Sequence, residues 1–107
     1  MGVRGILRYN SSVDRLNQLF KALANPGRRR VYQMICRGSR RDRPGLTVEK
    51  ICRVTGFKQP SVSHHLARLA SAGLIVRTRT RTWVHCAPLR EGLQPLRSFV
   101  RNPAAIR

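Results

Sequence analysis

Acidic residues are scarce in this sequence. Only 4 of the 107 residues are Asp or Glu, against 22 Lys and Arg, so the formal net charge is 22 − 4 = +18. The four carboxylates lie apart in the chain and form no paired pattern for acid–base catalysis. No Gly-rich phosphate loop or nucleophile motif occurs either. We therefore expect no catalytic residues, no cofactor and no enzymatic activity.

Long apolar segments, aromatic residues and cysteine motifs are also missing. No apolar run approaches the roughly 20 residues that cross a bilayer, and residues 1–8 are too short and too broken by Arg and Gly for a secretory signal. We expect a cytoplasmic protein without a membrane partner. Three cysteines without a CxxC pair argue against a disulfide framework. With only 6% aromatic residues, the chain offers no stacking platform for RNA bases.

Basic residues are what the sequence has in abundance, and a net charge of +18 predicts strong attraction to a polyanion. The length supports one domain with a modest core. We expect a basic lead-in over residues 1–10, a folded domain over residues 11–101 and a frayed tail over residues 102–107.

Apolar residues at helical spacing predict three helices in the first half of the chain. The first starts at Ser11 or Ser12 and ends near residue 24, and the second runs from Pro26 or Gly27 to about residue 37. A short third helix spans residues 48–55, with Thr47 as its cap. In the second helix, Val31, Met34 and Ile35 are expected inside, while Arg28 and Arg29 are expected to face water or phosphate. Residues 37–45, rich in Arg, Gly and Pro, are either a solvated connection or a direct phosphate contact.

A fourth helix is expected from Lys58 to Ala72, with Pro60 near its start and Gly73 just past its end. Its buried stripe consists of Val62, Leu66, Leu69 and Ala70. The opposite face presents hydroxyls, an imidazole and a cation, groups that can contact base edges and phosphates: Ser61, Ser63, His64 and Arg68. A short helix, a tight turn with Gly and a second helix with a polar outer face form a helix-turn-helix.

After this helix, the pattern changes to alternation, which predicts two strands over residues 74–79 and 83–88. Period-2 spacing places Arg77 and Arg79 on one face, and Arg81 loses that phase at the turn. These arginines either form a wing that grips DNA or protect an edge strand by charge. Trp83 is expected in the core of the hairpin.

A last helix follows within residues 89–101, and Pro95 either kinks it or delays its start. Its narrow apolar stripe pairs with a second chain or packs on its own domain. The stripe consists of Leu89, Leu93, Leu96 and Val100.

Several strings together resemble the ArsR/SmtB family of winged helix-turn-helix repressors: LFKALANP at 19–26, QPSVSHHL at 59–66, AGLIVR at 72–77 and WVH at 83–85. The resemblance implies a mainly α fold with a small β-hairpin, in which four helices precede the hairpin and one follows it. It also implies a homodimer paired through the first and last helices, including Leu16 and Leu19. Its partner would be double-stranded DNA with two-fold symmetry, read by two recognition helices.

The same resemblance places Gln59, Ser61, Ser63 and His64 where family members contact bases or phosphates. His65 is expected to be partly buried. The family's metal sites are missing, because Thr47 and Glu49 stand at the Cys-x-Cys positions and the last helix has no His or Asp. We therefore expect no bound metal, and the sequence names no effector.

The cysteines are the remaining candidates for a site that senses a signal. Some family members sense oxidants with two cysteines, and Cys36 matches the first position, while Cys86 is the nearest substitute for the second. The alternative is that Cys36, Cys52 and Cys86 are small buried hydrophobic residues.

These features predict a sequence-specific, dimeric transcriptional repressor. Two alternatives stay open: a DNA-coating or architectural protein of low specificity, which the charge favours, and a thiol-responsive repressor that uses Cys36.

Overall fold

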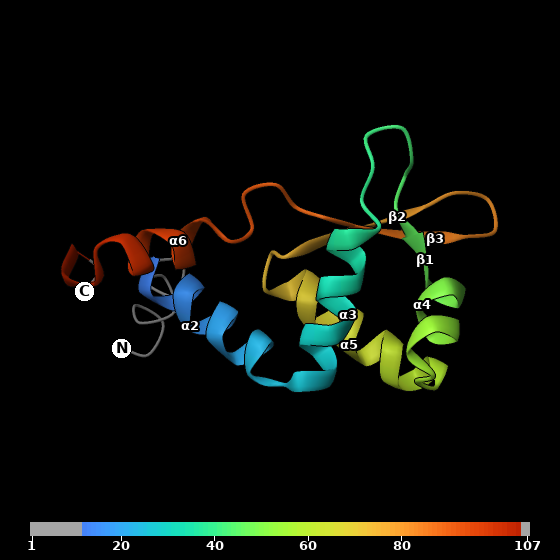
Figure 1. Ribbon diagram of the computed structural model, residues 1–107, viewed down its shortest axis with the longest axis horizontal. Coiled ribbons are helices and arrows are strands. Elements are labelled where there is room, and N and C mark those ends of the chain that lie inside the picture. Colours follow the sequence, from blue (N-terminus) through green and yellow to red (C-terminus); the bar gives the residue numbers. More distant parts are fainter. Residues whose placement is uncertain (1–11, 106–107) are drawn as a thin grey trace, which may run out of the picture.

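The computed structural model describes residues 12–105, and these form five α-helices, three strands and a short 3-10 turn (Figure 1). The predicted lead-in of residues 1–10 lies outside the described residues, as do Ser11 and residues 106–107. In chain order the elements are α2 (Ser12–Ala24), α3 (Pro26–Arg37), β1 (Leu46–Thr47), α4 (Val48–Thr55), α5 (Gln59–Ser71), β2 (Ile75–Arg79), β3 (Val84–Pro88), α6 (Gln94–Arg101) and the 3-10 turn η2 (Pro103–Ala105).

The corner between α2 and α3 is built by local hydrogen bonds. The Asn25 side chain accepts a hydrogen bond from the backbone N–H of Arg28 at 2.9 Å, which caps α3, and Pro26 occupies its first turn. The guanidinium groups of Arg28 and Arg29 donate back to the last carbonyls of α2, at 3.3 Å to Ala22 and 2.6 Å to Leu23. These carbonyls have no partner within the helix, so the two arginines complete its end.

The prediction that Arg28 is exposed was wrong. We expected it to face water or phosphate, but it is only 9% exposed. The tight turn at Asn25 folds α3 back on α2, so a side chain in the first turn of α3 lies against the end of the preceding helix. Arg29 remains exposed, as predicted.

The helix-turn-helix forms as predicted. Thr47 accepts a hydrogen bond from the N–H of Lys50 at 3.2 Å and starts α4, and Gly56, with a φ of 77°, ends it. In the next helix, α5, Lys58 is the N-cap residue but its side chain makes no capping hydrogen bond. Gly73, also with a φ of 77°, follows the end of α5 in the left-handed conformation expected of it.

The sheet has three strands and not the predicted two, in the order β1-β3-β2. The strands β2 and β3 form the expected hairpin, with Ile75 opposite Pro88. The extra strand β1 pairs antiparallel with β3, placing Leu46 opposite Cys86. Gly45, with a φ of 127°, lets the chain approach this closely, because a Cβ there would collide with the backbone of Cys86.

The hairpin turn and the last helix bring two further corrections. Trp83 is not a core residue but lies 46% exposed beside the turn, where its carbonyl accepts a hydrogen bond from Thr80 N–H at 2.9 Å. The helix α6 starts late, at Gln94, with Pro95 in its first turn. Leu89 therefore lies in the preceding loop and not on a helix, and its N–H donates to the carbonyl of Leu74 at 3.0 Å.

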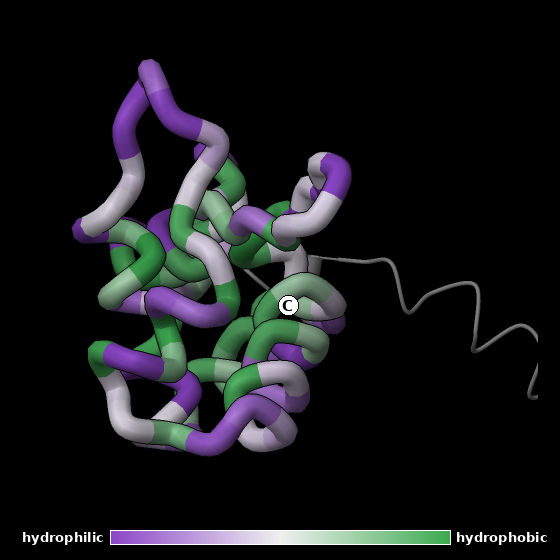
Figure 2. The backbone as a smooth tube through the Cα atoms, turned by 90° about the vertical axis from the view of Figure 1, so that its right-hand side faces the viewer, coloured by the Kyte–Doolittle hydropathy of each residue, from purple (hydrophilic) through white to green (hydrophobic). Residues whose placement is uncertain are grey.

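The core joins α3, α4 and α5 to the sheet and includes Leu19 and Ala22 of α2, while the outer part of α2 and α6 lie together at the other end of the molecule (Figure 1). Figure 2 shows hydrophobic segments gathered inside and a hydrophilic tip on the loop of residues 38–45. No described helix is long and apolar enough to span a membrane. The largest fully buried side chains include Leu19, Val31, Ile35, Ile51, Val62, Leu66, Leu69, Leu74, Ile75 and Cys86.

The buried stripe of α5 is expected to carry much of the stability. We predict that Leu69→Ala lowers the free energy of unfolding by about 2–5 kcal/mol, because the change leaves a cavity in the core. The control Val54→Ala, at a position 53% exposed, should cost less than about 1 kcal/mol. Urea denaturation followed by circular dichroism measures both, and equal losses would contradict the placement of α5.

Candidate nucleic-acid interface

One face of α5 is buried and the other is free. Val62, Leu66 and Leu69 are buried in the core. The residues predicted to contact DNA from this helix are all exposed, namely Gln59, Ser61, Ser63, His64 and Arg68. Burial of the apolar stripe thus leaves the polar face toward solvent.

The exposed residues form two rows along α5. Ser61, His64 and Arg68 follow one another at spacings of three and four residues, which places them on one line of the helix. Gln59 and Ser63, four residues apart, form a second row beside it. Ala67, which the sequence pattern did not predict as a contact residue, is also exposed. Its methyl group has the chemistry that contacts thymine methyls in a major groove.

His65 has a different environment from His64. It is partly buried, as predicted, and its ring centroid lies 6.1 Å from that of Phe57. Its Nδ1 is buried without a hydrogen-bond partner. Burial lowers the pKa of His65 below its ordinary value, and the charges of Arg28 and His64 lower it further. The neutral imidazole is therefore favoured, which suits a packing residue between α3 and α5.

The hairpin carries the predicted arginines on its surface. Arg77, Arg79 and Arg81 are all exposed. Arg77 and Arg79 lie two positions apart in β2, hence on the same face, whereas Arg81 lies in the turn beyond the strand. The structure thus brings two of the three arginines together on one strand and leaves the third at the tip.

The loop of residues 38–45 forms a separate basic projection. Arg40, Arg41 and Arg43 in it are exposed. Figure 1 shows this loop rising at the top of the view, on the side away from α4 and α5. This position favours the interpretation as a solvated connection over a contact with the DNA that α5 would read.

The residues predicted for dimerisation fall into three groups by exposure. Leu16 and Leu19 are buried within the chain, so their side chains offer little surface to a partner, while Leu93 and Leu96 are half-buried. Leu89 and Val100 are exposed, Val100 by 69%.

Two aromatic residues lie at a partly exposed apolar surface: Phe20, which the sequence places in the apolar stripe of the first helix, and the half-buried Phe99, which was not predicted to contribute. Phe20 of α2 is 44% exposed, and its ring meets that of Phe99 in α6 edge to face at 5.8 Å. We call Phe20, Phe99 and Val100 the α2–α6 apolar patch. Their nearness could not be read from the sequence, because α2 and α6 are far apart along the chain and meet only in the folded domain.

The three cysteines are free and differ in exposure. The expectation of small buried residues is right for Cys86 and wrong for Cys36, which is exposed, while Cys52 is intermediate. Burial raises the pKa of the Cys86 thiol to about 11, against a smaller opposite effect of Arg77. Because the thiolate is the reactive form, Cys86 is poorly suited to redox chemistry. In the described part of the chain, no group of three or more His, Cys, Asp or Glu side chains could hold a metal ion.

Comparisons with known proteins agree with this architecture. A family model described as a helix-turn-helix domain matches residues 23–78. A search of curated protein sequences gave no match. Among solved structures, an ArsR family transcriptional regulator is 25% identical, with a TM-score of 0.72 over 86% of this chain and 89% of that one.

Two further structures have the same fold. The homodimeric winged helix-turn-helix DNA-binding domain of a possible ArsR-family regulator from Mycobacterium bovis is 28% identical, with a TM-score of 0.67 over 92% of this chain and 85% of that one. An ArsR-like transcriptional regulator from Rhodococcus sp. RHA1 is 17% identical, with a TM-score of 0.71 over 87% of this chain and 83% of that one.

The environment of His65 gives a prediction about pH. Because its folded pKa is lowered, the unfolded chain binds more protons, and stability should fall as the pH drops below about 6.5 until it passes the folded pKa. Proton NMR should show His65 titrating below 6.5. In Arg28→Gln its pKa should rise only in part, since burial is the larger cause. Titration of His65 at or above 6.5 would contradict this environment.

Proposed function

Because this chain belongs to the helix-turn-helix domain family and is an ArsR-type DNA-binding transcriptional regulator, we propose that it represses transcription by occupying a specific operator as a homodimer. The observation that carries the proposal is the exposed polar face of α5, opposite its buried stripe. Repression would follow from occupancy alone, by denying access to a promoter.

Affinity and specificity would come from different residues. The wing would neutralise phosphates and release counterions through Arg77, Arg79 and Arg81. This contribution to affinity does not depend on the DNA sequence, so it would act on any duplex. Gln59, Ser61, Ser63, His64 and Arg68 on α5 would lie in the major groove, where hydroxyl, amide, imidazole and guanidinium groups distinguish base edges.

One observation favours a second function. A net charge of +18 on 107 residues is what a DNA-coating or architectural protein of low specificity would also have. A competition experiment distinguishes the two functions. A repressor stays bound to its operator in the presence of excess bulk DNA at physiological salt, whereas a coating protein shows little preference for any sequence.

Homodimerisation would use the α2–α6 apolar patch. Exposed Phe20 and Val100 on adjacent helices offer an apolar surface that a second copy could cover. The Mycobacterium bovis domain, similar along most of its length, is described as homodimeric. A two-fold axis through this patch would present two α5 helices to two half-sites.

A thiol response would depend on Cys36 alone. Cys36 is exposed, but Cys86 is buried in the central strand of the sheet and has a raised pKa. Because the Cys86 thiol is buried and its pKa is raised, a sensing role would fall to modification of Cys36 itself.

Base readout can be tested with an operator selected from a random DNA library. We predict that Gln59→Ala or Ser61→Ala weakens operator binding by about 1–3 kcal/mol, because each change removes a hydrogen bond to a base edge, and leaves random duplex binding nearly unchanged. Fluorescence anisotropy measures both affinities. The control Arg79→Gln should weaken operator and random duplex alike and lower the salt slope by about one. If the α5 variants weaken both duplexes in parallel, the assignment of base readout to α5 is wrong.

The dimer can be tested by placing a charge in the α2–α6 apolar patch. Val100→Glu should shift the protein from dimer to monomer in sedimentation experiments, because a carboxylate would be desolvated against a second copy. Val54→Glu, at an exposed apolar position of α4, is the matched control and should remain dimeric. A Val100→Glu protein that sediments as a dimer would place the interface elsewhere.

A further inference from the structure

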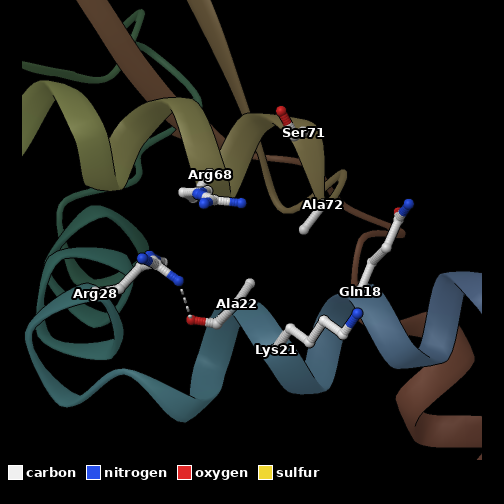
Figure 3. A pocket seen from close by; sticks show the side chains of 7 residues that line it. All are labelled: Gln18, Lys21, Ala22, Arg28, Arg68, Ser71 and Ala72. Carbon is white, nitrogen blue, oxygen red and sulfur yellow. Dashed lines mark hydrogen bonds between the residues drawn. The ribbon is translucent and has the colours of Figure 1, made fainter.

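A hollow lies between α2 and the C-terminal half of α5, closed at one end by the start of α3. Its volume is about 370 Å³, and it opens to solvent. That volume lies at the low end for small-molecule pockets, which measure about 300–1,000 Å³. The residues lining this α2–α5 hollow are Gln18, Lys21, Ala22, Arg28, Arg68, Ser71 and Ala72 (Figure 3).

Three of the lining residues are cations and none is acidic. Lys21 comes from α2, Arg28 from α3 and Arg68 from α5; all three line the hollow, and Figure 3 shows the Lys21 amine farther along α2 than the two guanidinium groups, on the side of Gln18. Like charges that line one hollow repel one another, and an anion bound in the hollow relieves that repulsion. Gln18 and Ser71 add polar groups, and Ala22 and Ala72 add methyl groups, so the charged groups of the lining are all cationic.

Arg28 makes the hollow more than a cluster of surface charges. Arg28 is nine-tenths buried, and its Nη1 donates a hydrogen bond to the carbonyl of Ala22 at 3.3 Å. Its Nε is buried with no partner. A guanidinium carries five N–H donors, and a buried charge is costly unless a counter-ion compensates it. The lining of the hollow provides no such counter-ion.

We propose that the α2–α5 hollow binds a phosphate-type oxyanion, held by Arg28, Arg68 and Lys21. Guanidinium groups match tetrahedral oxyanions with paired hydrogen bonds, and lysine adds a mobile point charge. The phosphate belongs either to a small phosphorylated molecule or to the backbone of bound DNA. Arg68 also lies on the outer face of α5, so an anion here would bear directly on the position of the recognition helix.

The site is tested first without DNA, by titrating inorganic phosphate into the full chain at constant ionic strength with chloride as the balancing ion. Backbone amide resonances of Ala22, Arg28 and Ser71 should shift together and saturate. Lys21→Met should weaken binding about two- to fivefold, as expected for one exposed cation, and Arg28→Lys should weaken it further by removing the paired donors. Arg15→Met, which removes an exposed charge from the same helix outside the hollow, should bind as the parent does.

Addition of duplex DNA identifies the source of the phosphate. If the DNA backbone supplies it, phosphate and DNA compete, and Lys21→Met lowers the salt slope by about one. If a small molecule supplies it, the DNA complex still binds phosphate, and glycerol 3-phosphate binds more tightly than inorganic phosphate. Shifts that spread over the whole basic surface, or equally weakened binding in Arg15→Met, would overturn the site. A failure of operator preference leaves the phosphate titration unchanged, so the two proposals fail separately.

Discussion

The burial of one apolar stripe on α5 is the constraint on which the rest of the structure depends. Val62, Leu66 and Leu69 are buried against a core built from α3, α4 and the sheet. Because successive helical residues are about 100° apart, a rotation of α5 by a single position would turn part of this stripe to water and bring polar groups into the core. Each of the buried side chains is worth about 1.5–3 kcal/mol, so packing alone holds the polar face outward. The chemistry of that face is therefore positioned by the buried residues on the opposite side of the helix.

The shortage of carboxylates determines which interaction partners the Lys and Arg side chains of this fold have. An ordinary domain pairs many of its Lys and Arg residues with Asp or Glu, but here 22 basic residues face 4 acidic ones. Arg28 and Arg29 instead donate hydrogen bonds to backbone carbonyls at the end of α2. The Cζ atom of Arg30 lies 5.4 Å from the centroid of the Phe57 ring. Most other arginines extend into solvent. A polyanion relieves the self-repulsion that remains, so binding of DNA and stability of the fold are expected to rise together.

The helices and the outer face of α5 could be predicted because their signals are local. Thr47, Asn25 and Gly73 are caps that act within one turn, and the stripe of α5 repeats within one helix. The predictions that were wrong depend on contacts between different elements of the fold. The strand β1 is two residues long, too short for any pattern, and exists because β3 lies beside it. Arg28 is buried by the fold of α3 onto α2, and Trp83 is left exposed by the turn that it adjoins. Neither outcome follows from residue type or spacing.

The helix α2 links the two surfaces proposed here for partners. Gln18 and Phe20 are two positions apart, so their side chains point in nearly opposite directions, one toward the α2–α5 hollow and the other toward the α2–α6 apolar patch. If a second copy covers the patch, α2 of each chain is fixed to the dimer axis. An anion in the hollow would then tie α5 to that fixed helix through Lys21 and Arg68. The distance between the two recognition helices, and with it the match to half-site spacing, would depend on the occupancy of the hollow, whether by a small molecule or by the DNA itself.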